Sequence, residues 1–169
     1  GAGMFTVSPP GSDGTASDAK FYTRSGELTI DKNGYLKTGD GAFVLGTAPG
    51  SVVGSDSPRI AMQIPFSDDG SSLTGLEITA GGKISATYGS DIVDKGSLTI
   101  ATFANQGGLK NVGSSRFSET TYSGSPAFGV AGQTGYGTLQ AGALEGSNVD
   151  ITQEMTVMIR AQQQFSGSA

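Results

Sequence analysis

The sequence predicts an all-β protein, an irregular β-sandwich or barrel that carries one amphipathic helix at its C-terminal end. Three observations lead to this prediction. Short apolar runs are separated by turn residues throughout the chain, and 28 of the 169 residues are glycine, more than twice the usual share. Apolar and polar residues alternate in most of these runs, as they do in strands with one buried face. A clear helical period occurs near the C-terminus.

The N-terminal part of the chain contains several strand patterns. Residues 1–7 and 21–25 have the composition of strands, and so does the short run 43–45. Residues 27–38 are predicted to form a β-hairpin, because Asn33-Gly34 stands between two alternating runs and both residues tolerate a positive φ. These elements predict a sheet that begins with the first residues.

Strand patterns continue to residue 144. Ile60, Met62 and Ile64 alternate with polar residues, and a second hairpin is expected over residues 76–88, around two adjacent glycines. Residues 97–103 and 138–144 are the remaining predicted strands. The segments rich in Gly, Pro and Ser are expected to be loops, at residues 9–17, 47–57 and 124–137.

Residues 148–169 are predicted to form the helix. Asn148 or Asp150 is suited to cap its N-terminus, because a short side-chain oxygen accepts from the free amides of the first turn. Apolar residues follow at spacings of three and four, which places them on one helical face: Ile151, Met155, Met158, Ile159 and Phe165. This face is expected to pack either on the β-domain or against a helix that is absent from this sequence or belongs to another copy. We therefore expect a body domain over residues 1–147, with a variable middle segment at 47–96, and a helix over 148–169.

The composition excludes several classes of function. The net charge is −5 and the ten basic residues are scattered, which argues against nucleic acid and against an anionic membrane as partners. No apolar run has membrane-spanning length, and the first residues lack the pattern of a signal peptide. The chain has no His and no Cys, so the usual general base, the commonest transition-metal ligands and the Ser-His and Cys-His pairs are missing. We expect no enzyme, no cofactor, no metal and no small-molecule substrate.

Clustered acids are the candidate metal or catalytic sites of the sequence. Asp31-Lys32-Asn33-Gly34 resembles the start of a calcium loop, but Ala42 stands where the closing bidentate acid belongs, and a hairpin turn is favoured. Asp68-Asp69 and the pair Asp91 and Asp94 would have to face another acid across a cleft in a glycosidase. Their Gly- and Ser-rich surroundings favour solvated turns instead.

The aromatic residues allow two interpretations. They would line a sugar-binding face, as in an adhesin-like module, or they would fill the core. Because the chain has 8 Phe, 5 Tyr and no Trp, which is enough for a core but poor for a stacking platform, the core is favoured. The residues concerned are Phe21, Tyr22, Tyr35, Phe43, Tyr88, Phe103, Phe117, Tyr122, Phe128 and Tyr136.

Several stretches resemble the axial proteins of the bacterial flagellum, the hook and rod family. The segment 1–5 is similar to the family's Gly-x-Gly-Phe-Phe start, and residues 22–36 are similar to its Tyr-Thr-Arg-x-Gly block and the hairpin after it. Residues 103–113 resemble its Phe-x-Asn-x-x-Gly-Leu-x-x-x-Gly segment. The most specific match is the ordered signature over residues 137–162, which includes Leu144-Glu145-x-Ser147-Asn148-Val149-Asp150.

This resemblance implies a structural subunit that assembles with copies of itself and with neighbouring axial proteins into a tube. It also implies a β-rich body between terminal helices, with helix 148–169 leading to a coiled coil of such helices in the tube. It further implies export without a cleaved signal peptide and a place in the flagellum, outside the cell for a hook or across the periplasm for a rod. The residue types in the C-terminal signature favour a hook subunit that links rod to filament. The short middle segment favours the alternative, a distal rod subunit. The residues Ile151, Met155, Met158, Ile159 and Phe165 are expected to form the self-assembly face.

Overall fold

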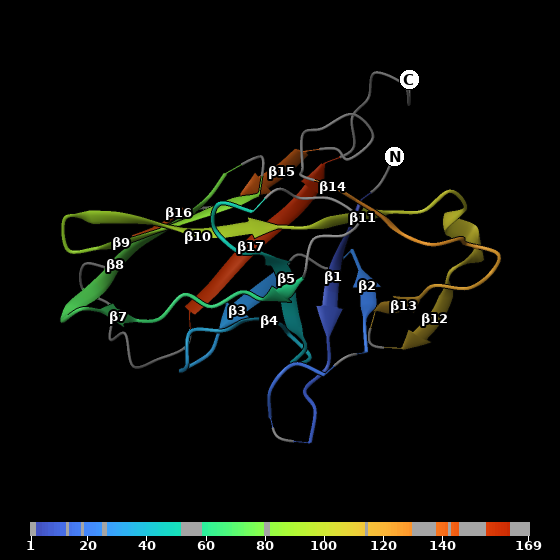
Figure 1. The fold of residues 1–169 in the computed structure, drawn as a ribbon, viewed down its shortest axis with the longest axis horizontal. Helices are drawn as coiled ribbons and strands as arrows, with labels where there is room; N and C mark the ends of the chain where they lie inside the picture. Colours follow the sequence, from blue (N-terminus) through green and yellow to red (C-terminus); the bar gives the residue numbers. More distant parts are fainter. Residues whose placement is uncertain are drawn as a thin grey trace.

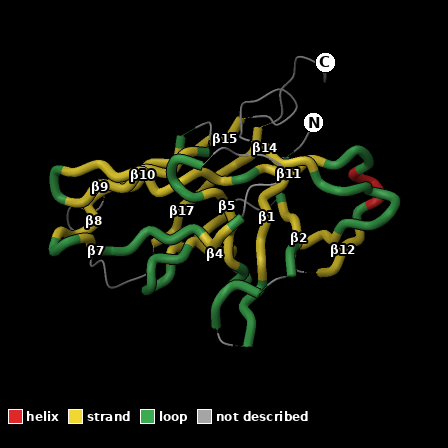
Figure 2. Tube along the Cα trace, viewed as in Figure 1, coloured by secondary structure: helices red, strands yellow, loops and turns green. Residues whose placement is uncertain are grey.

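The computed structural model describes most of the body of the chain and part of its C-terminal region. The described residues are 3–12, 14–17, 19–24, 27–51, 59–79, 82–113, 115–129, 138–141, 143–145 and 155–162, the last three segments as backbone. They form an elongated molecule built of strands (Figure 1). Among them, one short 3-10 turn, η1 (Gln106–Gly108), is the helical element, at one end of the long axis (Figure 2).

Short strands follow one another along the described chain. They are β1 (Met4–Ser8), β2 (Phe21–Thr23), β3 (Glu27–Ile30), β4 (Leu36–Thr38), β5 (Phe43–Thr47), β6 (Ile60–Ala61), β7 (Ser67–Asp68), β8 (Ser71–Ile78), β9 (Lys83–Tyr88), β10 (Asp91–Leu98), β11 (Ile100–Thr102), β12 (Lys110–Gly113), β13 (Arg116–Ser118), β14 (Ala127–Gly129), β15 (Thr138–Ala141), β16 (Ala143–Glu145) and β17 (Met155–Gln162).

Strand β1 lies at the centre of the first layer. It pairs antiparallel with β2 on one side, and with β11 and then β5 on the other. From β2 the layer continues through β13 to β12, and from β11 to β14. From β5 it continues through β4 and β3 to β17 and β15. Because β1 has neighbours on both sides and is buried along its whole length, it organises the fold.

A long antiparallel arm, β8–β9–β10, forms the second layer. It joins the first layer where Thr47 of β5 pairs with Ser97 of β10. The two strands approach closely there: a Cβ at Gly46 would lie 2.2 Å from the carbonyl oxygen of Ser97, and one at Gly96 would lie 2.2 Å from that of Thr47. Gly96 also has a φ of 105°, which an L side chain rarely adopts. Glycine is therefore required on both strands at this junction.

The main hydrophobic core lies between the two layers. It combines Phe5 and Val7 of β1 and Leu28 of β3 with Leu76 of β8 and Ile84 of β9, all less than 5% exposed. A second, smaller cluster lies on the other side of β1. It contains Met4, Tyr22, Ala101, Phe103 and Phe128. The two clusters lie on opposite faces of β1, which is buried along its whole length. The all-β prediction is confirmed, and hydrogen bonds connect the strands of both layers into one sheet.

Most of the predicted strands are found. The hairpin over residues 27–38 is β3–β4, in the register Ile30↔Leu36, and the second hairpin is β8–β9. The predicted strand at 97–103 is divided between β10 and β11, and that at 138–144 between β15 and β16. The first half of β10 was not predicted, because its residues 91–94 are mostly exposed and do not alternate. The division into 1–147 and 148–169 stays a prediction.

The predicted helix is not found among the described residues, and the structure corrects it for Met155–Gln162. This segment is β17, which pairs with β3 in the register Met155↔Ile30 and with β15 in the register Leu139↔Ala161. The sequence MTVMIRAQ permits this because it has a two-residue alternation as well as the helical spacing, and because Thr, Val and Ile favour strands. Strand β3 pairs with its first half, Met155–Met158, and β15 pairs with its second half, Ile159–Gln162. Residues 148–154 and 163–169 lie outside the described residues.

Candidate self-assembly surface

The residues predicted to form the self-assembly face are only partly described. Met155, Met158 and Ile159 lie on β17, where the first two pair with β3 and Ile159 pairs with β15. Ile151 and Phe165 lie outside the described residues. The helical stripe is therefore not assembled as predicted in the described segment, and the role of these five residues in subunit contacts stays a prediction.

Asp31 serves the hairpin turn. Its Oδ1 accepts hydrogen bonds from the backbone N–H of Asn33 and of Tyr35, both at 2.9 Å, and its Oδ2 lies 3.0 Å from Lys37 Nζ. Gly34 has a φ of 88°, and its backbone packs against Ile64 so closely that a Cβ would lie 2.5 Å from that residue's carbonyl oxygen. These contacts confirm the hairpin interpretation over the calcium loop. In the part of the chain that the structure describes, no group of three or more acidic side chains is placed to hold a metal ion.

Of the other acids, Asp69 lies in a turn as predicted, whereas Asp68 lies on β7 and Asp91 and Asp94 lie on β10. Asp69 has a φ of 47° in the turn between β7 and β8, and Asp94 Oδ1 accepts from the N–H of Gly96 at 2.9 Å, at the bulge of β10. A groove of about 340 Å³ lies elsewhere, and none of the predicted acid pairs lines it. Its lining includes Asp40, which is paired with Arg116 at 3.1 Å. The groove offers an ion pair and hydroxyls, an arrangement suited to binding a polar surface.

Most of the aromatic side chains are buried, as predicted. Tyr22 and Phe103 meet edge to face with ring centroids 4.9 Å apart, and Tyr35 and Phe43 do so at 5.2 Å. Burial, together with the charge of Glu119, raises the pKa of Tyr22 to about 12. Tyr122 is the exception, since 81% of it is exposed, and the core prediction is wrong for this residue. Tyr136 lies outside the described residues.

Tyr122 is presented by a loop that hydrogen bonds hold in place. Thr120 Oγ1 accepts from the N–H of Tyr122 and of Ser123, both at 3.1 Å, and Ser123 Oγ accepts from the N–H of Thr120 at 2.9 Å. Asn105 Nδ2 donates to the carbonyl of Tyr122 at 3.1 Å. Gly108 packs against this loop, where a Cβ would lie 2.5 Å from the Ser123 nitrogen. The sequence signal for this loop is Thr120-Thr-Tyr-Ser-Gly124, a run of turn-forming residues.

The opposite end of the molecule carries the other strongly exposed apolar side chain among the described residues. Ile92 is 75% exposed and follows the turn between β9 and β10, at the far end of the long axis from the Tyr122 loop (Figure 1). The turn between β7 and β8, with Asp68 and Asp69, lies beside it, since the N–H of Gly89 donates to the carbonyl of Ser72 at 3.3 Å.

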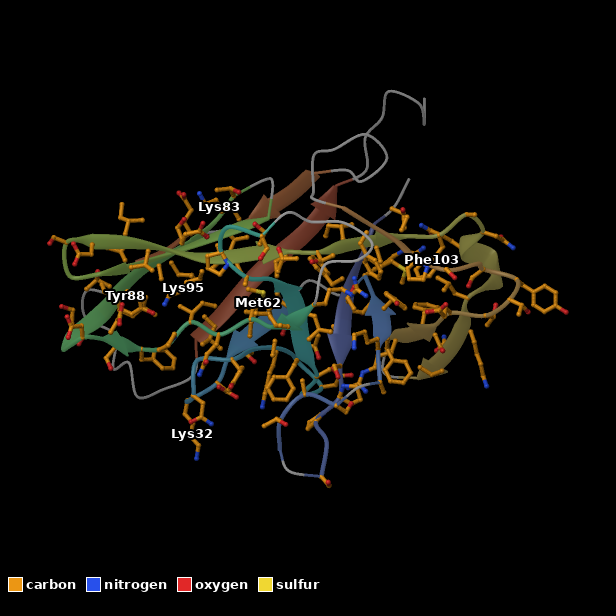
Figure 3. All side chains as sticks on the ribbon, in the orientation of Figure 1. Lys32, Met62, Lys83, Tyr88, Lys95 and Phe103 are labelled. Carbon is orange, nitrogen blue, oxygen red and sulfur yellow. The ribbon has the colours of Figure 1, made fainter. Side chains whose placement is uncertain are left out.

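Tyr88 supports this end from within. Its hydroxyl donates to the carbonyl of Pro65 at 2.6 Å, and burial, with the nearby charge of Asp68, raises its pKa to about 12. Lys95 Nζ lies 5.1 Å from the centre of the Tyr88 ring, and Figure 3 shows the two side chains together on the arm, far from Phe103. The end of the arm is therefore acidic, and the contacts of Tyr88 with Pro65 and Lys95 hold it in place.

Comparison with known proteins places these features in a family. A family model described as the flagellar hook protein FlgE/F/G D1 domain matches residues 1–86, and one described as the flagellar basal body rod FlgEFG protein C-terminal matches residues 140–169. Among the described residues, no helix has the length and hydrophobicity required to span a membrane.

Curated relatives carry the names of the rod and the hook. The flagellar basal-body rod protein FlgG of Bacillus subtilis is 36% identical over 170 residues, which is 100% of this chain and 56% of the relative. FlgG of Agrobacterium fabrum is 36% identical over 89% of the chain and 51% of the relative. The flagellar hook protein FlgE of Treponema pallidum is 39% identical over 57% of the chain and 21% of the relative.

The chain thus spans about half the length of the rod proteins that it matches. Hook and rod are structural parts of the bacterial flagellum, and the names of the matching proteins describe no enzyme. Two family models, one at each end of the sequence, agree with relatives that align over all or nearly all of it. The chain therefore belongs to the FlgE/F/G family of flagellar hook and basal-body rod proteins.

Proposed function

We propose that the protein is a subunit of the distal rod of the flagellar basal body, which functions by assembling with copies of itself and with neighbouring axial proteins. The observation that carries this proposal is the extent of the matches. Proteins named as rod components align with 89% and 100% of the chain, whereas a hook protein aligns with 57% of it. These extents favour the rod, the alternative of the sequence analysis, over the hook.

The construction of the body agrees with a rigid structural part. The two layers share one hydrophobic core, and the close approach of β5 and β10 at Gly46 and Gly96 leaves no room for sliding between them. A rod transmits torque without bending, so a subunit with a tightly joined body suits it. None of the predicted acid pairs lines the groove, so the groove gives no support to a hydrolase.

Subunit contacts are proposed to involve the C-terminal segment with Ile151, Met155, Met158, Ile159 and Phe165. Residues 140–169, which carry the motif, match a separate C-terminal family model. This match supports a role for the region that members of the family have in common. The double substitution Met155→Asp and Ile159→Asp places two charges in the segment. We expect the full-length variant to be exported but absent from assembled rods, as measured by immunoblotting of isolated basal bodies. Normal incorporation of the variant would contradict this role.

Location distinguishes the rod from the hook. Immunogold labelling of isolated hook–basal bodies, in the bacterium that makes the protein, is expected to mark the rod. The label is also expected to remain on basal bodies from a strain that lacks the hook. A label confined to the hook, and lost with it, would refute the rod proposal and support the hook instead.

A further inference from the structure

The two ends of the molecule carry surfaces that complement each other. The Tyr122 end consists of Tyr122, Val112 and Lys110, and the Ile92 end consists of Ile92, Asp91, Asp68 and Asp69. Tyr122 is 81% exposed and Ile92 is 75% exposed, whereas the other exposed large apolar side chains of the described residues, Ile60 and Val112, are about half as exposed. Because the two ends lie at opposite extremes of the long axis, they do not meet within one molecule (Figure 1).

The Tyr122 end is a preorganised anchor. The loop that carries the ring is fixed by the hydrogen bonds of Thr120, Ser123 and Asn105, so little conformational entropy is lost when the ring is buried. Tyrosine is enriched among the residues that dominate protein interfaces. An exposed tyrosine on a rigid loop therefore fits a contact between proteins better than a loose surface side chain would.

The charges of the two ends have opposite signs. Asp68, Asp69 and Asp91 take part in none of the ion pairs of the described residues, and Lys95 lies over the Tyr88 ring. The last acid of the arm, Asp94, lies 3.9 Å from Lys83.

At the Tyr122 end Lys110 is exposed on β12, and Arg24 is exposed beside η1, with its guanidinium bonded to Gln106. Glu119 is the exposed acid of this end, and Arg116 is already paired with Asp40. Opposite charges steer and orient association, whereas two Ile92 ends would repel each other. The occupant that fits the Ile92 end is thus the Tyr122 end of another copy.

We propose that the Tyr122 end of one subunit docks on the Ile92 end of the next, with the Tyr122 ring against Ile92 and Lys110 facing the aspartates. This inference rests on the proposed function, since it names the contact by which copies would associate. The two contact surfaces are different, so the contact is heterologous and each new subunit offers a fresh end for another. Repetition of such a contact produces an open array rather than a closed dimer.

The test relies on introduced cysteines, since residues 1–169 contain none, and any cysteine elsewhere in the full-length protein is first replaced by serine. The double variant Ile92→Cys with Tyr122→Cys, in the full-length protein, is treated with a short bismaleimide cross-linker in isolated basal bodies and in concentrated purified protein. We expect a ladder of dimers and longer products. The matched control is Ile60→Cys with Tyr122→Cys, because Ile60 is also exposed, at 44%, but lies on β6 away from the Ile92 end. A single-cysteine variant gives a cross-linked dimer only if the same surface of two copies meets, so each single variant tests for a symmetric contact. Thermal melting checks that the variants fold.

A charge exchange sharpens the test. Lys110→Glu is expected to lower the cross-linked yield by about twofold to fivefold, the effect of one exposed ion pair, and adding Asp91→Lys is expected to restore it. Equal yields from the control pair, products from the single variants, or no ladder in either preparation would overturn the proposal. Detection of the protein in rods without a selective ladder would overturn this contact alone, whereas absence of the protein from rods would refute the proposed function.

Discussion

The middle of the molecule and its Tyr122 end are held together in different ways. In the middle, two layers bury a continuous apolar core, with residues such as Phe5 and Ile84 exposed by 1% or less. At the Tyr122 end, β12 is exposed along its whole length, and side-chain and backbone hydrogen bonds hold the loop. Apolar burial supplies most folding stability, whereas a hydrogen bond contributes about 1 kcal/mol net. The difference suggests that the middle provides stability and the end provides a shaped surface.

The largest effect is expected from Phe5→Ala. The ring is 1% exposed in the main core, so its removal leaves a cavity and should lower the free energy of unfolding by about 3–5 kcal/mol. The matched change at the other region is Val112→Ala, where the side chain is 42% exposed and the expected loss is below about 0.5 kcal/mol. Urea denaturation of both variants measures the comparison. Losses of similar size in the two variants would contradict this distinction, because the Tyr122 end would then contribute as much to the free energy of unfolding as the core does.

A smaller loss is expected from Gly46→Ala. The new Cβ would lie 2.2 Å from the Ser97 carbonyl oxygen and 2.4 Å from Met62 Sδ, so β5 and β10 must separate, at a cost of roughly 1–3 kcal/mol. Gly39→Ala is the control, because nothing lies within 4 Å of its Cβ position. Thermal melting should separate the two variants clearly. An unchanged melting temperature for Gly46→Ala would mean that the layers are not tightly joined.

Tyr88→Phe tests the base of the Ile92 end. Loss of the hydrogen bond to Pro65 should lower the free energy of unfolding by about 1 kcal/mol near neutral pH. The pKa of Tyr88 is about 12 in the folded protein and near 10 when the chain is unfolded, so the folded state favours the protonated phenol. This contribution is fully present below pH 10 and is lost as the pH rises from about 10 to about 12.

The variant should therefore lose less stability than the parent over that interval, although Tyr22 contributes a dependence of the same sign in both proteins. Denaturation measured at several alkaline pH values provides the comparison. Parallel stability curves would exclude the raised pKa of Tyr88 as a source of the pH dependence.

The smallest effect on global stability is expected from Asn105→Ala. It removes the bond to the carbonyl of Tyr122 at an exposed position, so the loss should stay below about 1 kcal/mol. Hydrogen exchange of the amides at residues 120–124 should nevertheless accelerate, because the loop loses a brace. Asn111→Ala is the control, since its side chain bonds Gly113 in the neighbouring hairpin. Unchanged exchange at the loop would show that Tyr122 does not depend on Asn105.

Local patterns predicted part of the fold, and long-range pairing decided the rest. The β3–β4 hairpin was predictable because Asn33-Gly34 and Asp31 define the turn within a few residues. The first half of β10 was not predictable, because residues 91–94 are held by pairing with β9 while most of their surface stays exposed. Segment 155–162 carries two periods, and pairing with β3 and β15 selects the strand.

The site was less predictable than the fold. Tyr122 and Phe103 are both aromatic residues beside turn-forming sequence, yet one is exposed and the other is buried against Tyr22. No local pattern distinguishes them, because exposure depends on which strands cover each position. Ile92 has the same ambiguity, since an isolated isoleucine in a polar run gives no sign of whether a second layer covers it.

By itself, the sequence determined the all-β class, the hairpin turns and the family, because turn chemistry, alternation and ordered motifs are properties of neighbouring residues. The tertiary structure decided which apolar residues are covered, which of two periods residues 155–162 follow, and that the loop of Tyr122 and the strand of Ile92 lie at opposite ends. The physical reason is that burial and strand pairing join residues far apart in the chain, such as Thr47 with Ser97. Their energies depend on the whole fold rather than on any one segment.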